Sequence, residues 1–161
     1  MTLKSDAETL RLALLTRLVD AAAVVAWADR LILADRIAEA PVVLDLSLAG
    51  SRPTADIVEL LGQVPGTIDQ AAVGRHVAAQ LRRALDSGQL DVVGVARAMY
   101  RLLREGYSPD SDFEGMAYCA DDGVDLALAG SYGTLDDIRE QLTAFLERYQ
   151  ETEVEVAPPA A

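Results

Sequence analysis

DVVGVARAMYRLLREG, residues 91–106, carries the signals of one complete amphipathic helix. Asp91 is a preferred N-cap residue, and Gly106 suits the left-handed conformation that often ends a helix. Between these two residues the apolar side chains recur at the spacing of one helix face, and they are Val92, Val95, Met99 and Leu102. The pattern predicts a helix that buries one face and exposes the other.

The same spacing recurs along the rest of the chain and predicts an all-α fold. Further helices are expected over residues 6–19, 21–34, 54–61, 68–87, 113–129 and 134–149. The residues placed to begin or end them are Ser5, Asp20, Thr54, Gly88 and Thr134. We therefore expect a single-domain bundle of about six to seven helices over residues 1–149. Residues 150–161 are acidic and rich in proline and alanine, without a core-forming pattern, which predicts a mobile tail.

Residues 41–49 fit two structures. Three leucines alternate there with two polar residues, as in a strand, whereas Pro41 suits the first turn of a helix. A lone strand needs a partner that few other segments supply. A short helix is therefore the favoured prediction, and a short strand is the alternative.

The bulk composition favours some partners and disfavours others. A chain of 161 residues is about one domain, and its net charge is −12. Such a field repels nucleic acids and anionic membranes but attracts a basic protein. The sequence contains no run of about 20 apolar residues, the length needed to span a bilayer.

Cys119 has no cysteine to pair with, so we expect a small core residue in a reducing cytoplasm. Arginine supplies 13 of the 14 basic residues, which indicates GC-rich coding DNA and a bacterial source.

The segment from Glu105 to Ile138 is the clearest functional feature. Its 34 residues contain nine acids and four of the eight aromatic residues of the chain, but no lysine or arginine. Carboxylates steer a basic partner and exposed tyrosines anchor it, so we expect a non-enzymatic protein-binding surface. The predicted contact residues are Asp110, Asp112, Glu114, Asp121, Asp122, Asp125, Tyr107, Tyr118 and Tyr132. The alternative is that the acids serve solubility and the rings belong to the core, and the exposure of the tyrosines distinguishes the two.

The basic residues of the chain are concentrated just before this segment. We expect them to be solvated or to pair with the acidic segment, because too few aromatic residues lie among them for a nucleic-acid surface. They are Arg75, Arg82, Arg83, Arg97, Arg101 and Arg104.

Residues 121–125, DDGVD, match the DDxxD motif with which helical prenyl-diphosphate enzymes hold magnesium and a diphosphate. On a helix Asp121 and Asp125 lie one turn apart, where two carboxylates can share a cation. A small metal-dependent enzyme acting on a phosphorylated substrate is therefore an alternative function. The motif stands alone, however, since a second metal motif and nearby basic residues are missing. His76 is the only histidine, and nucleophile, Walker, dinucleotide and zinc patterns are absent, so we expect no catalytic residue, metal or cofactor.

Three strings are spread over most of the chain: AWADRLI at residues 26–32, LDLSL at residues 44–48, and the acidic helix that runs into Tyr132-Gly133. In this order they resemble small helical bacterial proteins, some of which are immunity proteins of polymorphic-toxin loci. Immunity proteins of this kind act by stoichiometric binding and have no catalytic residues, so the resemblance implies a binding protein and transfers no catalytic residue. It favours the interpretation of the acidic segment as a binding surface. A helical adaptor or self-assembling protein is a third alternative, because the sequence does not define the oligomeric state.

Overall fold

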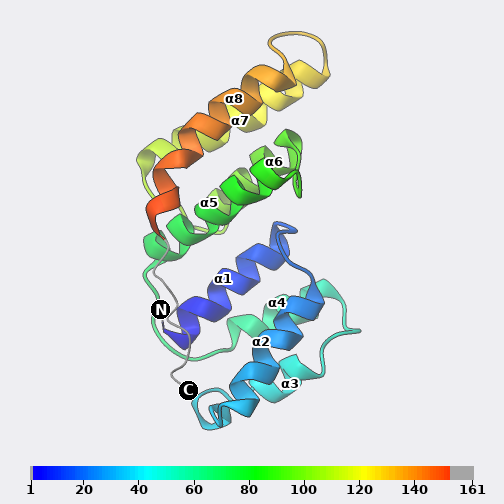
Figure 1. The fold of residues 1–161 in the computed structure, drawn as a ribbon, viewed down its shortest axis with the longest axis vertical. Coiled ribbons are helices and arrows are strands. Elements are labelled where there is room, and N and C mark those ends of the chain that lie inside the picture. The colour runs from blue at the N-terminus through cyan, green and yellow to red at the C-terminus, as the bar shows by residue number, and fades with distance from the viewer. Residues whose placement is uncertain (1, 153–161) are drawn as a thin grey trace. The chain divides into compact units, whose positions relative to one another are not determined.

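Figure 1 shows a computed structural model of the protein, which describes residues 2–152. All regular structure in this part of the chain is helical, with eight α-helices, two short 3-10 helices and no strand. The predicted all-α class is confirmed, with slightly more helices than the expected six to seven. Residues 41–49 contain the short helix α3 (Val43–Ser47), so the favoured helix is confirmed and the strand alternative is wrong.

By its internal packing the chain divides into two compact units, Met1–Val73 and Gly74–Ala161, which we call the N-terminal unit and the C-terminal unit. The boundary lies inside helix α5 (Gln70–Ser87), which is continuous across it. The single domain expected over residues 1–149 therefore stays a prediction. Of the predicted tail, residues 153–161 lie outside the described residues, and its first three residues end the 3-10 helix η2 (Glu147–Thr152).

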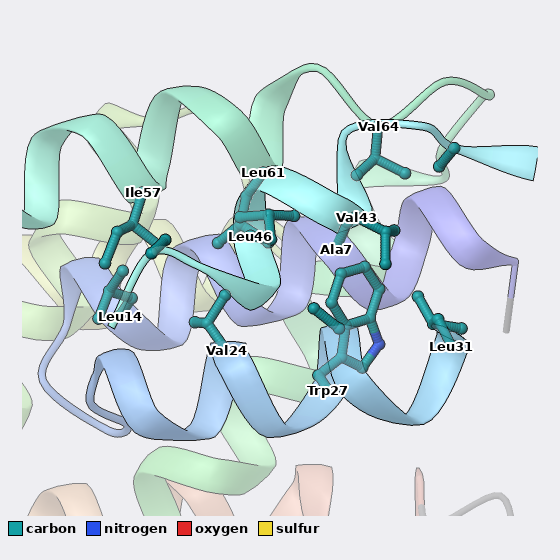
Figure 2. Close-up of a cluster of buried hydrophobic side chains, with 13 residues drawn as sticks. Ala7, Leu14, Val24, Trp27, Leu31, Val43, Leu46, Ile57, Leu61 and Val64 are labelled. Carbon is teal, nitrogen blue, oxygen red and sulfur yellow. The ribbon is translucent and has the colours of Figure 1, made fainter. Parts of the chain in front are cut away.

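The N-terminal unit is built from α3 and three longer helices, with one 3-10 helix between α2 and α3. Their bounds are α1 (Leu3–Leu15), α2 (Ala21–Leu33), η1 (Ile37–Glu39) and α4 (Thr54–Gly62). Helix α1 packs against α4, and α2 packs against α3. Figure 2 shows the Trp27 ring among apolar side chains of the other helices, and Trp27 is only 8 % exposed, so it anchors the core of this unit.

Two predicted caps in this unit are wrong. Helix α1 begins at Leu3, and its cap is Thr2 rather than Ser5, because the Thr2 hydroxyl accepts a hydrogen bond from the Ser5 backbone N–H at 3.1 Å. The earlier start adds the partly buried Leu3 side chain to the core. At α4, Pro53 occupies the cap position, and Thr54 is the first helical residue.

The C-terminal unit contains most of α5 together with three further helices and η2. Their bounds are α6 (Val92–Arg104), α7 (Ser111–Leu128) and α8 (Leu135–Leu146). Helix α6 packs against α7 and α8, and α7 also packs against α8, beside which it runs in Figure 1. The buried stripe predicted for α6 is confirmed at all four positions. Phe113 is fully buried, with the Phe145 and Tyr149 ring centroids 6.4 and 6.0 Å from its own.

The other residues predicted to begin or end helices do so, although α1 ends at Leu15 rather than at residue 19 and α8 ends at Leu146 rather than at residue 149. Asp20, Asp91 and Thr134 each accept a hydrogen bond from a backbone N–H in the first turn of the helix that follows. Gly88 and Gly106 have φ angles of 72° and 83°, in the left-handed region where glycine is favoured. Among the described residues, no helix combines the length and apolar character needed to cross a membrane.

Gly74 lets a loop approach helix α5 closely. A Cβ atom at this position would lie 2.4 Å from the Tyr107 carbonyl oxygen and 3.1 Å from the Pro109 nitrogen. Both atoms belong to the backbone of the loop between α6 and α7, which cannot yield as a side chain would. The start of the acidic segment is therefore fixed against α5 by the absence of a side chain at residue 74.

Candidate functional site

The acidic segment forms the loop after α6, all of α7 and the first turn of α8. The Asp110 carboxylate starts α7 by accepting a hydrogen bond from the Phe113 backbone N–H at 2.8 Å. One face of α7 is buried in the core of the C-terminal unit, through Phe113, Ala117, Ala120 and Val124. The remaining faces decide which acids are available to a partner.

Two of the predicted contact acids are occupied by an arginine of the neighbouring helix α6. Arg97 donates to the Asp121 carboxylate at 2.5 Å and also to the Asp125 carboxylate. The hydrogen bonds to Asp125 and Asp121 raise the pKa of the Arg97 guanidinium above its ordinary value. The expected pairing between the arginines and the acidic segment is therefore confirmed for Arg97.

Two further acids hold the opposite end of α7. The Tyr149 hydroxyl donates to the Asp110 carboxylate at 2.8 Å. The pKa of the Tyr149 phenol is raised well above its usual range, mainly by burial and to a smaller extent by this hydrogen bond. Arg148 donates to the Asp112 carboxylate at 3.0 Å. Four of the six predicted contact acids thus join α7 to other elements of its own unit.

The other two acids are exposed and make no ion pair or hydrogen bond within the described residues. They are Glu114 and Asp122, and four-residue spacing places them on one side of α7 with Tyr118 and Leu126. Tyr118 is 52 % exposed and Leu126 is 44 % exposed. We call these four residues, Glu114, Tyr118, Asp122 and Leu126, the α7 stripe. Along it, acidic and large apolar side chains alternate.

The three predicted tyrosines have different environments. Tyr107 is only 5 % exposed, so its selection as a surface contact is wrong: the chain reverses after α6 and carries this ring into the core. Tyr132 is 79 % exposed in the loop before α8. Tyr118 is held edge-to-face by Tyr100 of α6, with ring centroids 5.8 Å apart.

Several exposed side chains of this region were not identified from the sequence. Leu126 and Leu128 at the end of α7 are 44 and 59 % exposed, and Asp136 and Glu140 are exposed on α8. The four-residue spacing from Asp122 to Leu126 was a signal that could have found one of them. Cys119 is exposed rather than buried, because it lies away from the apolar face of α7, so its predicted core position is wrong.

The metal alternative gains no further ligands from the fold. Within residues 2–152, no three histidine, cysteine, aspartate or glutamate side chains are grouped so that they could hold one ion. The two carboxylates of the DDxxD pattern face Arg97, whose positive charge occupies the place between them. No family model, curated protein or solved structure matches the chain.

Proposed function

We propose that this chain is a non-enzymatic binding protein that recognises a basic protein through the α7 stripe and the neighbouring Tyr132. The observation that carries the proposal is the alternation of unpaired acids with exposed apolar side chains along one side of α7. Single exposed apolar residues are common on protein surfaces, whereas here a tyrosine and a leucine share one side of a helix with two carboxylates that have no ion-pair partner among the described residues. Tyrosine is enriched at interfaces, and the carboxylates favour a partner of positive charge.

Electrostatics support a basic partner in two ways. The net charge of −12 attracts cations over long range and accelerates encounter. At short range, Glu114 and Asp122 have no cation of their own within the described residues, so a partner can pair with them without first breaking an internal bond. Tyr118 supplies a ring of the kind that contributes strongly to interfaces, already ordered by its contact with Tyr100.

Stoichiometric masking of a basic protein, as in an immunity protein, is the specific form of this proposal. It requires a surface of fixed shape rather than reacting groups. The internal pairs of Asp121 and Asp125 with Arg97 hold α7 on α6 and so keep the stripe in one position.

The proposal is tested by affinity capture with three full-length baits. The unmodified chain is compared with the double variant Tyr118→Ala/Asp122→Lys and with Glu59→Lys, which alters an exposed acid of α4 in the N-terminal unit. We expect a basic protein that binds the first and third baits in a 1:1 complex and is lost from the second. Equal capture by all three baits, or capture of acidic proteins alone, would contradict the proposal.

A specific observation also favours self-assembly as a second candidate. Leu44 of α3 and Leu48, the residue that caps the end of this helix, are 47 and 77 % exposed, and Leu33 at the end of α2 is 85 % exposed. Light scattering of the purified chain at two concentrations tests this candidate. A mass that grows with concentration and returns to the monomer in Leu44→Ser/Leu48→Ser would support it, whereas a constant monomer would exclude it.

A further inference from the structure

We infer that the partner segment seated on the α7 stripe is an amphipathic helix that alternates basic and aliphatic side chains at every fourth position. This inference rests on the proposed function and identifies the kind of segment recognised. It follows from the spacing of the stripe, from the backbone chemistry of the surface and from one glycine beside the stripe.

The four-residue spacing of the α7 stripe determines which side chains a partner segment needs. Successive members of the stripe are about 6 Å apart along the helix axis, since each residue of an α-helix rises about 1.5 Å. Two carboxylates alternate with a tyrosine and a leucine in this row. A second helix with arginine or lysine and leucine or isoleucine at the same four-residue spacing places each cation opposite an acid and each aliphatic group opposite an apolar side chain.

The surface also requires a partner that satisfies its own backbone. The N–H and C=O groups in the middle of α7 are bonded within the helix, and the part of the chain that the structure describes has no strand edge to which an extended peptide could be added. An extended segment that lies on α7 would remove some of its own N–H and C=O groups from water, and these groups would have no hydrogen-bond partner on α7. A helical segment avoids this cost because its bonds are internal.

Gly115 provides room for close approach. It lies in the exposed first half of α7, next to Glu114, and a Cβ atom built there meets nothing within 4 Å. A glycine inside a helix costs about 1 kcal/mol relative to alanine, and nothing in the packing of the C-terminal unit requires one here. A neighbouring helix gains from this residue because its backbone can come closer to α7 at that point.

The test uses two labelled helical peptides of about 20 residues, a length at which isolated helices become stable. In the first peptide, arginine and leucine alternate at every fourth position along one side of an alanine-rich helix. The second has the same composition, with the arginines and leucines on opposite sides. Fluorescence polarisation with the full-length chain should show at least about tenfold tighter binding of the first peptide. Equal affinity for the two peptides, or no binding of either, overturns the inference.

Variants locate the binding site. Tyr118→Ala should weaken binding of the first peptide at least about tenfold, and Asp122→Asn about two- to fivefold. The matched neutralisation Glu59→Gln on α4 should leave the affinity unchanged. If neither stripe variant differs from Glu59→Gln, the peptide binds elsewhere and the inference is wrong.

Gly115→Gln gives a readout in which stability and binding move in opposite directions. Glutamine is a good helix former, so the melting temperature should rise, while the new side chain should weaken binding of the first peptide about tenfold. Gly62→Gln, at an exposed glycine ending α4 with nothing within 4 Å, is the control and should not change the affinity. Unchanged affinity in Gly115→Gln would show that the partner helix does not pack closely against α7 at this residue.

The outcome separates this inference from the function on which it rests. A basic protein captured through Tyr118 and Asp122, together with equal binding of the two peptides, would retain the proposed function and reject the helical partner. A complex between two copies of the chain that is lost in Tyr118→Ala/Asp122→Lys, detected by light scattering, would show that the stripe binds a second copy and would reject both.

Discussion

The two units use ion pairs differently. In the N-terminal unit, Glu8 pairs with Lys4 at 2.9 Å and with Arg11 at 2.7 Å, four and three residues away on the same helix. Arg36 and Glu39 are likewise three residues apart. In the C-terminal unit, Arg97 pairs with acids 24 and 28 residues away. Ion pairs therefore mainly reinforce individual helices in the first unit and hold separate helices together in the second.

The two units also contain different kinds of aromatic residue. The only tryptophan, Trp27, lies in the N-terminal unit, whereas all five tyrosines and both phenylalanines lie in the C-terminal unit. Selectively excited tryptophan fluorescence thus reports on the first unit, and tyrosine signals in near-ultraviolet circular dichroism report on the second. Each unit carries its own natural probe, which makes the comparison measurable.

The largest effects are expected from truncations in the two cores. Leu46 and Leu102 are fully buried, one in each unit, and replacing either with alanine should lower the free energy of unfolding by about 2–5 kcal/mol. Urea unfolding followed by both probes then tests the predicted single domain over residues 1–149. In one domain, each variant shifts both transitions together. A shift confined to the probe of the altered unit would contradict the single domain.

Replacing a glycine with alanine should change stability in opposite directions in the two units. Gly74→Ala introduces a methyl group that clashes with the Tyr107 backbone, so it should destabilise the C-terminal unit by about 1–3 kcal/mol or more. Gly62→Ala in the N-terminal unit meets nothing within 4 Å and should be neutral or stabilising. Thermal unfolding measures both variants. A stable Gly74→Ala would show that the loop after α6 can move away from α5.

Loss of the interhelical ion pairs should have a smaller effect. Arg97→Gln removes the cation shared by Asp121 and Asp125 and should cost about 1 kcal/mol, with a smaller difference from the unmodified chain at high salt. Arg36→Gln removes an exposed pair within one turn and serves as the matched control, for which we expect little change. Equal effects of the two variants in urea unfolding would contradict the distinction between the units.

The pH dependence contributed by Tyr149 should appear only at alkaline pH. Because its pKa is raised in the folded protein, the unfolded chain ionises first, above about pH 10. Its contribution to stability is complete below that pH and falls as the pH rises, by about 1 kcal/mol between pH 10 and pH 11. Urea unfolding of Tyr149→Phe should lack this part of the decline. An identical decline in the two proteins would show that Tyr149 ionises normally.

Much of the fold could be predicted because its signals are local. Asp20, Asp91 and Thr134 begin helices through bonds to residues three positions later, and the stripe of α6 follows helical spacing. The errors at Ser5 and Thr54 are shifts of a helix start by a few residues, because Thr2 caps α1 and Pro53 occupies the cap position of α4 without a side-chain hydrogen bond. Local signals place helix boundaries to within a few residues.

The candidate site could be predicted only in part. Charge counting found the acidic segment, and the sequence alone determined its helices, its lack of lysine and arginine, and its candidate residues. The fate of each acid depended on residues far along the chain: Arg97, Arg148 and Tyr149 occupy four of the six. Burial of Tyr107 and exposure of Tyr118 depended on how α6 and α7 pack.

The acidic segment shows which properties follow from the sequence and which depend on the tertiary structure. Helix formation and total charge arise from neighbouring residues and simple sums, so the sequence by itself determined them. Only the tertiary structure decided which carboxylates are neutralised by arginine and which side of α7 remains open, because ion pairing and burial depend on distances between residues that lie far apart in the chain. Of the nine predicted contact residues, the structure leaves Glu114, Tyr118, Asp122 and Tyr132 exposed and without an ion pair among the described residues, and it exposes Leu126 beside them.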